Sequence, residues 1–210
     1  NVTAYDGQGN MASDIKHYTI DRTRPIIYDM DVGYPSGQSS VRNTQNITLK
    51  AVVTDSPDIA AGIYSVEANL TYLNSTNWVN MTFVSGSKKS DMNSTWHLNV
   101  SVSSNTGNKL ARIRVYDAAT PTHNTAGGRF WNVVIDNNIP TYTGLNSTDG
   151  IYNNTQGTFI ITANDNYELD HYIFSNNWSG SWVNDSSVSI SGTSEYIESK
   201  KVIYTGNFSY

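Results

Sequence analysis

Cysteine is absent from this sequence of 210 residues. The chain therefore has neither a disulfide nor a thiolate metal site. A cysteine-free sequence fits reducing compartments and many prokaryotic cell surfaces alike, so this absence does not decide where the protein works.

Charged residues are also scarce. They make up 15% of the chain, and the formal net charge is −5. Nucleic acids and anionic membrane surfaces bind clustered Lys and Arg, so we expect neither as a partner. Solubility must come instead from uncharged polar residues, because the chain holds 25 Asn, 25 Ser and 22 Thr.

Long apolar runs are missing as well. No run approaches the ~20 residues that a helix needs to cross a bilayer, so the sequence predicts no membrane insertion by this segment. Hydrophobic residues nevertheless account for 38% of the chain and aromatic residues for 11%. That content is sufficient for packed cores and argues against a disordered chain.

Apolar and polar residues alternate with a period of two, which is the pattern of half-buried strands. No stretch shows a persuasive helical period, and turn-forming segments separate the apolar stripes. The sequence therefore predicts an all-β chain with a sandwich architecture. Five stripes share this pattern: Ile47, Leu49, Ala51 and Val53; Val66, Ala68, Leu70 and Tyr72; Trp96, Leu98, Val100 and Val102; Ala111, Ile113 and Val115; and Trp131, Val133 and Ile135.

An internal repeat is the strongest pattern in the sequence. Its anchors align Tyr5-Asp6 with Tyr116-Asp117, Ile20-Asp21 with Ile135-Asp136, Pro25 with Pro140, Thr44-Gln45 with Thr155-Gln156, and Asp55 with Asp165. Between the first two anchors the offset grows from 111 to 115 residues, which indicates a four-residue loop insertion. A period of about 111–115 residues is the size of one immunoglobulin-like sandwich, so the sequence predicts tandem Ig-like repeats.

The repeat divides the chain into three parts. Residues 1–22 are interpreted as the last hairpin of a preceding or neighbouring-copy repeat, residues 23–136 as a complete repeat, and residues 137–210 as the first two-thirds of another. The partial repeat lacks the two strands that residues 1–22 contain, so we expect a neighbouring copy to complete it. That neighbour is either a separate subunit or the next stretch of a covalent array. The expected assembly joint consists of Val2, Ala4, Tyr18 and Ile20.

Two copies of one sequence motif carry a family resemblance. The motif is Ala4-Tyr5-Asp6-Gly7 through Gly9-Asn10 followed by Ile20-Asp21-Arg22-Thr23-Arg24-Pro25, and its second copy lies at 115–117 and 135–140. It resembles the final strands and linker of tandem Ig-like repeats in prokaryotic surface proteins, including archaeal S-layer glycoproteins and adhesins. The second copy departs from the pattern, because Pro121 and His123 replace the Gly-rich turn. The resemblance implies an architecture and transfers no catalytic residue.

Asn-x-Ser/Thr sequons occur about twice as often as the composition alone gives. Asn69 and Asn99 stand out of phase with their apolar stripes, so we expect both to face solvent, where a glycan can be attached. The alternative is a polar surface in which sequons arise by composition. The predicted glycosylation sites are Asn1, Asn46, Asn69, Asn74, Asn80, Asn93, Asn99, Asn146, Asn153, Asn177, Asn184 and Asn207.

Few side chains are arranged to carry chemistry. Asp29 and Asp31 are weak candidates for a calcium site near a linker, and the capping of turns by Asp is the favoured interpretation. The four histidines lack the spacing of a metal pair, and no nucleophile motif accompanies Asp170-His171. The sequence therefore predicts no enzyme activity, no metal and no cofactor other than covalent N-glycans.

Three functions remain open. The first is a structural protein of the cell surface, an S-layer or extracellular fibre in which copies of the chain join head to tail. The second is an adhesin or carbohydrate-binding module that uses Trp178 and Trp182 in the loop around residues 176–184. The third is an accessory domain of a secreted enzyme. A tandem array favours the first, so we expect an extracellular protein whose partners are copies of itself.

Overall fold

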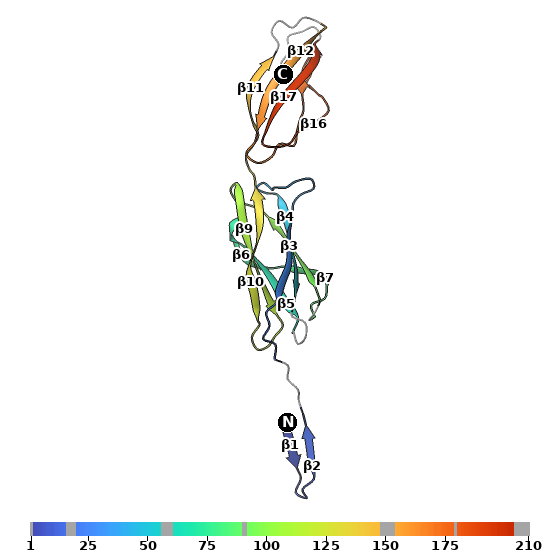
Figure 1. Ribbon diagram of the computed structural model, residues 1–210, viewed down its shortest axis with the longest axis vertical. Coiled ribbons are helices and arrows are strands. Elements are labelled where there is room, and N and C mark those ends of the chain that lie inside the picture. The colour runs from blue at the N-terminus through green and yellow to red at the C-terminus, as the bar shows by residue number, and fades with distance from the viewer. Residues whose placement is uncertain are drawn as a thin grey trace. The chain divides into compact units, whose positions relative to one another are not determined.

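The computed structural model describes residues 2–15, 20–55, 61–89, 92–147, 154–178 and 180–203. Within these ranges nearly every regular element is a strand, and all named strand pairs are antiparallel (Figure 1). The one helix among them is the single turn α1 (Thr71–Asn74). The all-β prediction is therefore confirmed. The chain separates into two compact units, Asn1–Asp136 (unit 1) and Asn137–Tyr210 (unit 2).

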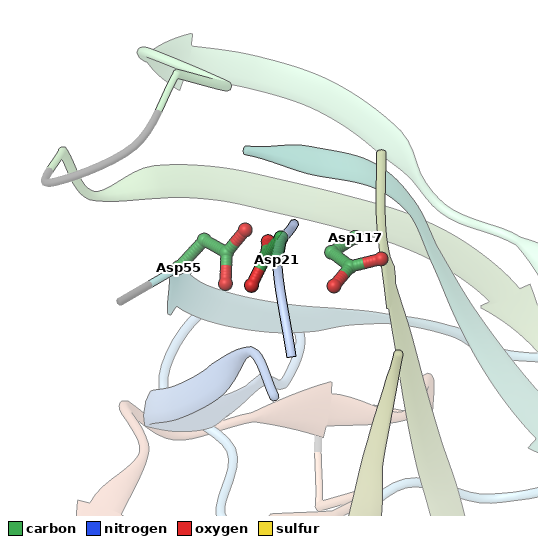
Figure 2. Close-up of side chains that lie close together, drawn as sticks. All are labelled: Asp21, Asp55 and Asp117. Atoms are coloured by element: carbon green, nitrogen blue, oxygen red, sulfur yellow. The ribbon is translucent and has the colours of Figure 1, made fainter. Parts of the chain in front are cut away.

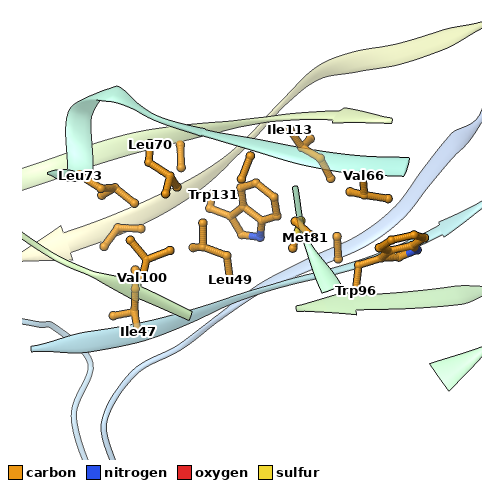
Figure 3. Packing of buried hydrophobic residues seen from close by; sticks show 14 of the residues in the cluster. Ile47, Leu49, Val66, Leu70, Leu73, Met81, Trp96, Val100, Ile113 and Trp131 are labelled. Carbon is orange, nitrogen blue, oxygen red and sulfur yellow. The ribbon is translucent and has the colours of Figure 1, made fainter. Parts of the chain in front are cut away.

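Unit 1 contains two four-stranded sheets in a sandwich-like arrangement. The first sheet has the order β3 (Ile26–Gly33), β4 (Asn46–Thr54), β8 (Ser94–Ser101) and β7 (Thr82–Gly86). The second has the order β10 (Thr125–Ile135), β9 (Gly107–Asp117), β5 (Ile63–Leu70) and β6 (Thr76–Asn80). One cluster of buried apolar side chains from both sheets forms the core (Figure 3).

The five apolar stripes supply most of that core. The strands alternate buried and more exposed residues, as β4 does from Ile47 to Val53, because successive side chains of a strand point to opposite faces. Trp96 and Trp131 are buried, as their positions in the apolar stripes predict. Tyr72 is the exception, because the chain leaves β5 for α1 at Thr71 and the tyrosine ring is 60% exposed.

Trp131 joins the two sheets. Its ring is 2% exposed on β10, and its Nε1 donates a 2.8 Å hydrogen bond to the backbone oxygen of Lys50 on β4. The backbone amide of Val41 also donates to the backbone oxygen of Val134 at 3.0 Å. The β9–β10 hairpin thereby covers the apolar face of the β3–β4–β8 strands.

Unit 2 has a related sheet without such a cover in the described residues. Its order is β11 (Thr141–Ser147), β12 (Thr155–Asn164) and β17 (Ser194–Ile203), so the middle strand comes second along the chain, as β4 does between β3 and β8. Two small antiparallel pairs accompany it: β13 (His171–Tyr172) with β16 (Val188–Ser189), and β14 (Ser175–Asn176) with β15 (Val183–Asn184).

Apolar burial in unit 2 is sparse. Among its described residues, the buried hydrophobic side chains are Phe159, Leu169 and Ile197. Leu145 is 56% exposed and Trp182 is 61% exposed. A sheet of this size therefore leaves apolar surface facing solvent.

The chain begins with a separate hairpin, β1 (Val2–Tyr5) and β2 (Met11–Asp14), in which Tyr5 pairs with Met11. Every side chain described from Thr3 to Ile15 is exposed, including Tyr5 at 69% and Met11 at 63%. The described residues include no helix long and apolar enough to cross a membrane.

Candidate functional site

Three carboxylates meet at one end of unit 1, and we call this cluster the acidic junction (Figure 2). It consists of Asp21, which precedes β3, Asp55, which follows β4, and Asp117, which ends β9. One oxygen from each residue lies within 4.8 Å of the other two, and Asp55 and Asp117 are buried. The junction thus joins three segments that are distant in the sequence.

Backbone amides satisfy Asp55 and Asp21. Asp55 accepts a 2.9 Å hydrogen bond from the amide of Gly62, and Asp21 accepts one of 2.8 Å from the amide of Ala61. Gly62 has a φ of +85°, and a Cβ there would lie 2.2 Å from the backbone oxygen of Lys88. Only glycine fits this position. With glycine there, the consecutive amides of Ala61 and Gly62 can donate to Asp21 and Asp55.

Asp117 holds the turn between β9 and β10. Its Oδ1 accepts from the amides of Ala119 at 3.1 Å and Asn124 at 2.8 Å, while its Oδ2 accepts from Asn124 Nδ2 at 2.7 Å. Asn124 Nδ2 also donates to the backbone oxygen of Asp21 at 3.3 Å. Hydrogen bonds therefore connect the turn both to the end of β9 and to the segment that leads into β3.

The pKa of Asp21 is lowered from its ordinary value. Burial acts in the opposite direction and is the largest single influence, but hydrogen bonds from the Thr23 hydroxyl, the Ala61 amide and the Thr23 amide together outweigh it. The Thr23 hydroxyl donates to Asp21 Oδ1 at 2.6 Å. These donors favour the charged carboxylate, so Asp21 remains ionised where the three acidic groups meet.

The acidic junction differs from the site considered in the sequence. Asp29 and Asp31 are exposed on β3, and neither belongs to the cluster. Asp29 accepts from the adjacent Met30 amide at 2.8 Å, and Asp31 pairs with Lys50 at 3.3 Å. Carboxylate oxygens suit hard cations such as calcium. The contacts present in the junction include hydrogen bonds from backbone amides and from the side chains of Thr23 and Asn124.

The β1–β2 turn repeats the hydrogen bonds of the β9–β10 turn. Asp6 Oδ1 accepts from the amides of Gln8 at 3.0 Å and Asn10 at 2.9 Å, and its Oδ2 accepts from Asn10 Nδ2 at 2.7 Å. The backbone amide of Asp6 donates to the Asn10 oxygen at 3.0 Å, as that of Asp117 donates to Asn124 at 3.1 Å. The Asn10 side chain is the leading cause of a lowered pKa at Asp6.

The two turns also locate the change of offset between the repeats. Asp6 and Asp117 are 111 residues apart, whereas Asn10 and Asn124 are 114 apart, so three extra residues lie in the β9–β10 turn. A β-bulge also lies between Gly127 and Phe130 of β10. Three of the four residues by which the offset grows therefore lie in the turn.

Among the hollows that open on the described part of unit 2, an apolar one and a polar one include residues of β11. The apolar hollow has a volume of about 380 Å³, and its lining includes Leu145, Phe159, Ile161, Phe174, Trp182 and Ile197. The polar hollow has a volume of about 650 Å³ and is lined by Asn137, Asn138, Ile139, Thr141, Asn164, Asp165 and Asn166. The first lies against β11, β12 and β17, and the second lies where β12 ends beside the start of β11.

The residues expected at the assembly joint are described only in part. Ala4 is exposed on β1, and Ile20 is 63% exposed. Tyr18 and the side chain of Val2 lie outside the described residues. The two described members of the set are therefore apolar and accessible.

The sequons differ in accessibility. Asn99 is exposed on β8, while Asn69 is half-buried because its Nδ2 donates to Asn77 at 2.9 Å. Asn74 and Asn177 are also half-buried. The remaining described sites are exposed, namely Asn46, Asn80, Asn93, Asn146 and Asn184, whereas Asn1, Asn153 and Asn207 lie outside the described residues.

The tryptophans of the 176–184 loop do not form one exposed patch. Trp178 is half-buried, and its ring lies 6.1 Å from Phe174 and 6.3 Å from Phe159. Trp182 is exposed and lines the apolar hollow. His171 Nδ1 contacts Asp170 at 2.8 Å on the surface.

No protein-family model matches the chain, and no match was found among curated proteins or solved structures.

Proposed function

We propose that this chain is a structural, non-catalytic component of an extracellular fibre or S-layer, built from tandem Ig-like repeats that associate head to tail. In this assembly the β1–β2 hairpin and the residues that follow it, up to residue 22, complete the sandwich of unit 2 in a neighbouring copy. The proposal includes N-glycans on the exposed sequons and a location at the cell surface.

The contrast between the two related sheets supports this proposal most directly. In unit 1 the β9–β10 hairpin covers the sheet, and Trp131 fills the space above β4. In unit 2 the corresponding face carries the apolar hollow and leaves Leu145 and Trp182 more than half exposed. Contiguous exposed apolar surface of this kind marks a site of association.

The β1–β2 hairpin has the features of the missing cover. It reproduces the Asp–Asn turn of the β9–β10 hairpin, and it aligns with that hairpin in the repeat. Its Met11 side chain is exposed, as is Ile20 in the following segment. Docking on unit 2 of another copy would bury apolar surface on both partners, which is the main driving force of association.

The contact is heterologous, since a hairpin of one copy meets a sheet of the next. Contacts of this type generate filaments when the rotation between successive copies does not close a ring. Sugars on exposed sites such as Asn99 would keep the remaining strands soluble and block lateral pairing of strand edges.

Sedimentation velocity of the full chain over a concentration series tests the proposal, with electron microscopy of the heaviest fractions. We expect association that grows with concentration and linear particles. A folded chain that stays monomeric at the highest concentration would overturn the proposal.

A carbohydrate-binding module is the second candidate, because the exposed Trp182 ring borders the apolar hollow and aromatic faces stack on sugars. Titration of the monomeric chain with oligosaccharides, followed by Trp fluorescence, separates the two candidates. Saturable quenching that Trp182→Ala removes, in a chain that does not self-associate, would favour this second function.

A further inference from the structure

We propose that the acidic junction of unit 1 has a counterpart formed between copies, in which the Asp6–Asn10 turn of one chain occupies the polar hollow beside Asp165 of another. This inference rests on the proposed function and adds the residues that fix the register of the joint. Three structural correspondences support it: between the ends of two strands, between two carboxylates and between two turns.

The first correspondence places Asp165 where Asp55 stands. Asp55 directly follows β4, whose last residue, Thr54, pairs with Ile26, the first residue of β3. Asp165 directly follows β12, whose last residue, Asn164, pairs with Thr141, the first residue of β11. The two carboxylates therefore leave equivalent ends of equivalent middle strands.

The second correspondence concerns the amides that these carboxylates hold. Asp55 accepts from the Gly62 amide at 2.9 Å, and Asp165 Oδ1 accepts from the amides of Tyr167 at 2.8 Å and Glu168 at 3.1 Å. Each carboxylate thus fixes the chain that leaves its middle strand. Asp165 is half-buried, whereas Asp55 is 1% exposed. Asp165 is therefore the more accessible of the two carboxylates to a turn from another chain.

The third correspondence concerns the turn that lies beside the carboxylate. In unit 1 this turn begins at Asp117, which accepts hydrogen bonds from the backbone amide and the side-chain amide of Asn124. Asp6 holds Asn10 through the same atoms, at distances that agree within 0.1 Å. The β1–β2 hairpin, whose described side chains from Thr3 to Ile15 are exposed, therefore carries a turn of the same kind.

The polar hollow is the place that this turn would fill. In unit 1 the β9–β10 turn lies against the segment before β3, to which Asn124 donates. In unit 2 the segment before β11, residues 137–139, lines the polar hollow together with Asn164 and Asp165. Seating the Asp6–Asn10 turn there also directs β1 and β2 along the sheet toward the apolar hollow, because the two hollows share Thr141 of β11.

The absence of native cysteine makes a crosslinking experiment specific. One chain carries Asp6→Cys, another carries Asp165→Cys, and the two are mixed and treated with a short thiol-to-thiol crosslinker after association. A second mixture pairs Asn10→Cys with Asn137→Cys, which keeps the Asp6 carboxylate and its hydrogen bonds from the backbone amides of Gln8 and Asn10. The matched control pairs Asp6→Cys with Asp29→Cys, which replaces an exposed aspartate on β3.

We expect the 6–165 and 10–137 mixtures to give at least about tenfold more crosslinked heterodimer than the control, because docking raises the local concentration of the two thiols to about millimolar. If the chains associate in sedimentation velocity but neither pair exceeds the control, the junction between copies is wrong and the proposed function stands. If the unmodified chain does not associate, both proposals fail.

Discussion

Asn124 donates its side-chain amide to Asp117 across the β9–β10 turn at 2.7 Å, and the same bond joins Asn10 to Asp6 at 2.7 Å in the β1–β2 turn. In the first case the carboxylate is buried in the acidic junction, and in the second it is exposed. The same Asp–Asn hydrogen-bonded turn is thus packed in unit 1 at Asp117 and accessible at Asp6.

Removing the carboxylate should have different effects in the two turns. Asp117→Ala leaves the buried amide of Ala119 without its acceptor, so we expect unit 1 to lose at least about 2 kcal/mol of stability. Asp6→Ala should leave the stability of the two four-stranded sheets of unit 1 unchanged and weaken association between copies. Native-state hydrogen exchange of the β4 and β9 amides measures the first effect, and sedimentation velocity measures the second. Equal destabilisation of unit 1 by both variants would count against the distinction.

Two leucines offer a matched test of the core. Leu49 on β4 is 0% exposed, and Leu110 on β9 is 46% exposed. Leu49→Ala should destabilise unit 1 by about 2–5 kcal/mol, because it removes buried methyl groups and leaves a cavity. Leu110→Ala should change the free energy of unfolding by about 0.5 kcal/mol or less. Urea denaturation followed by far-ultraviolet circular dichroism gives both values, and similar losses in the two variants would be inconsistent with the sandwich core.

Unit 2 offers a test of the apolar face. Leu145 lines the apolar hollow on β11 and is 56% exposed, so Leu145→Ser should alter the fold of the single chain little. Burying a leucine side chain is worth about 1.5–3 kcal/mol. We therefore expect the dissociation constant between copies to rise about tenfold or more.

The matched control for this face is Leu110→Ser, which changes an exposed leucine of unit 1. Sedimentation equilibrium of both variants gives the two dissociation constants. An equal weakening by the two substitutions would mean that the apolar hollow is not the docking surface.

Asp21 makes part of the stability of unit 1 dependent on pH. Its folded-state pKa lies below the ordinary value of 3.8, so its contribution is present above that pH and is lost as the pH falls through the folded pKa. Thr23→Val removes the hydroxyl donor and should raise the pKa of Asp21, which flattens the fall in unfolding free energy below about pH 4. Urea denaturation at a series of pH values from neutral to acidic measures how steeply the unfolding free energy falls with pH. An unfolding free energy that falls as steeply in the variant as in the wild type would exclude this role for Thr23.

Glycosylation is expected first at the most accessible sequons. In the protein isolated from its native source, peptide mass spectrometry should find sugar on Asn99, and Ser101→Ala should remove it while the asparagine remains. Asn105, which is followed by Thr-Gly, is not part of a sequon and serves as the internal control. Absence of sugar from both Asn99 and Asn69 would remove the glycoprotein part of the proposal.

The strands of unit 1 could be predicted because their signal is local. Ile47, Leu49 and Val53 share a face by period alone, and all three are buried. Tyr72 breaks its stripe because α1 turns the chain away after β5, which the alternation does not encode. Asn69 lies on the outward face, yet its contact with Asn77 on β6 leaves it half-buried.

The acidic junction could not be predicted in this way. Asp21, Asp55 and Asp117 meet because the sheet order brings three separate segments to one end of unit 1. No spacing in the sequence specifies that meeting. The repeat did contain a signal, since all three residues are repeat anchors. Charged repeat anchors are therefore better candidates for clustered side chains than closely spaced acidic residues such as Asp29 and Asp31.

A cryo-electron microscopy map of the associated protein tests the head-to-tail account most directly. The account predicts density for the β1–β2 hairpin of one copy over the β11–β12–β17 sheet of the next, with the Asp6–Asn10 turn beside Asp165. A map in which that sheet face remains open to solvent, or in which a different element covers it, would contradict the account.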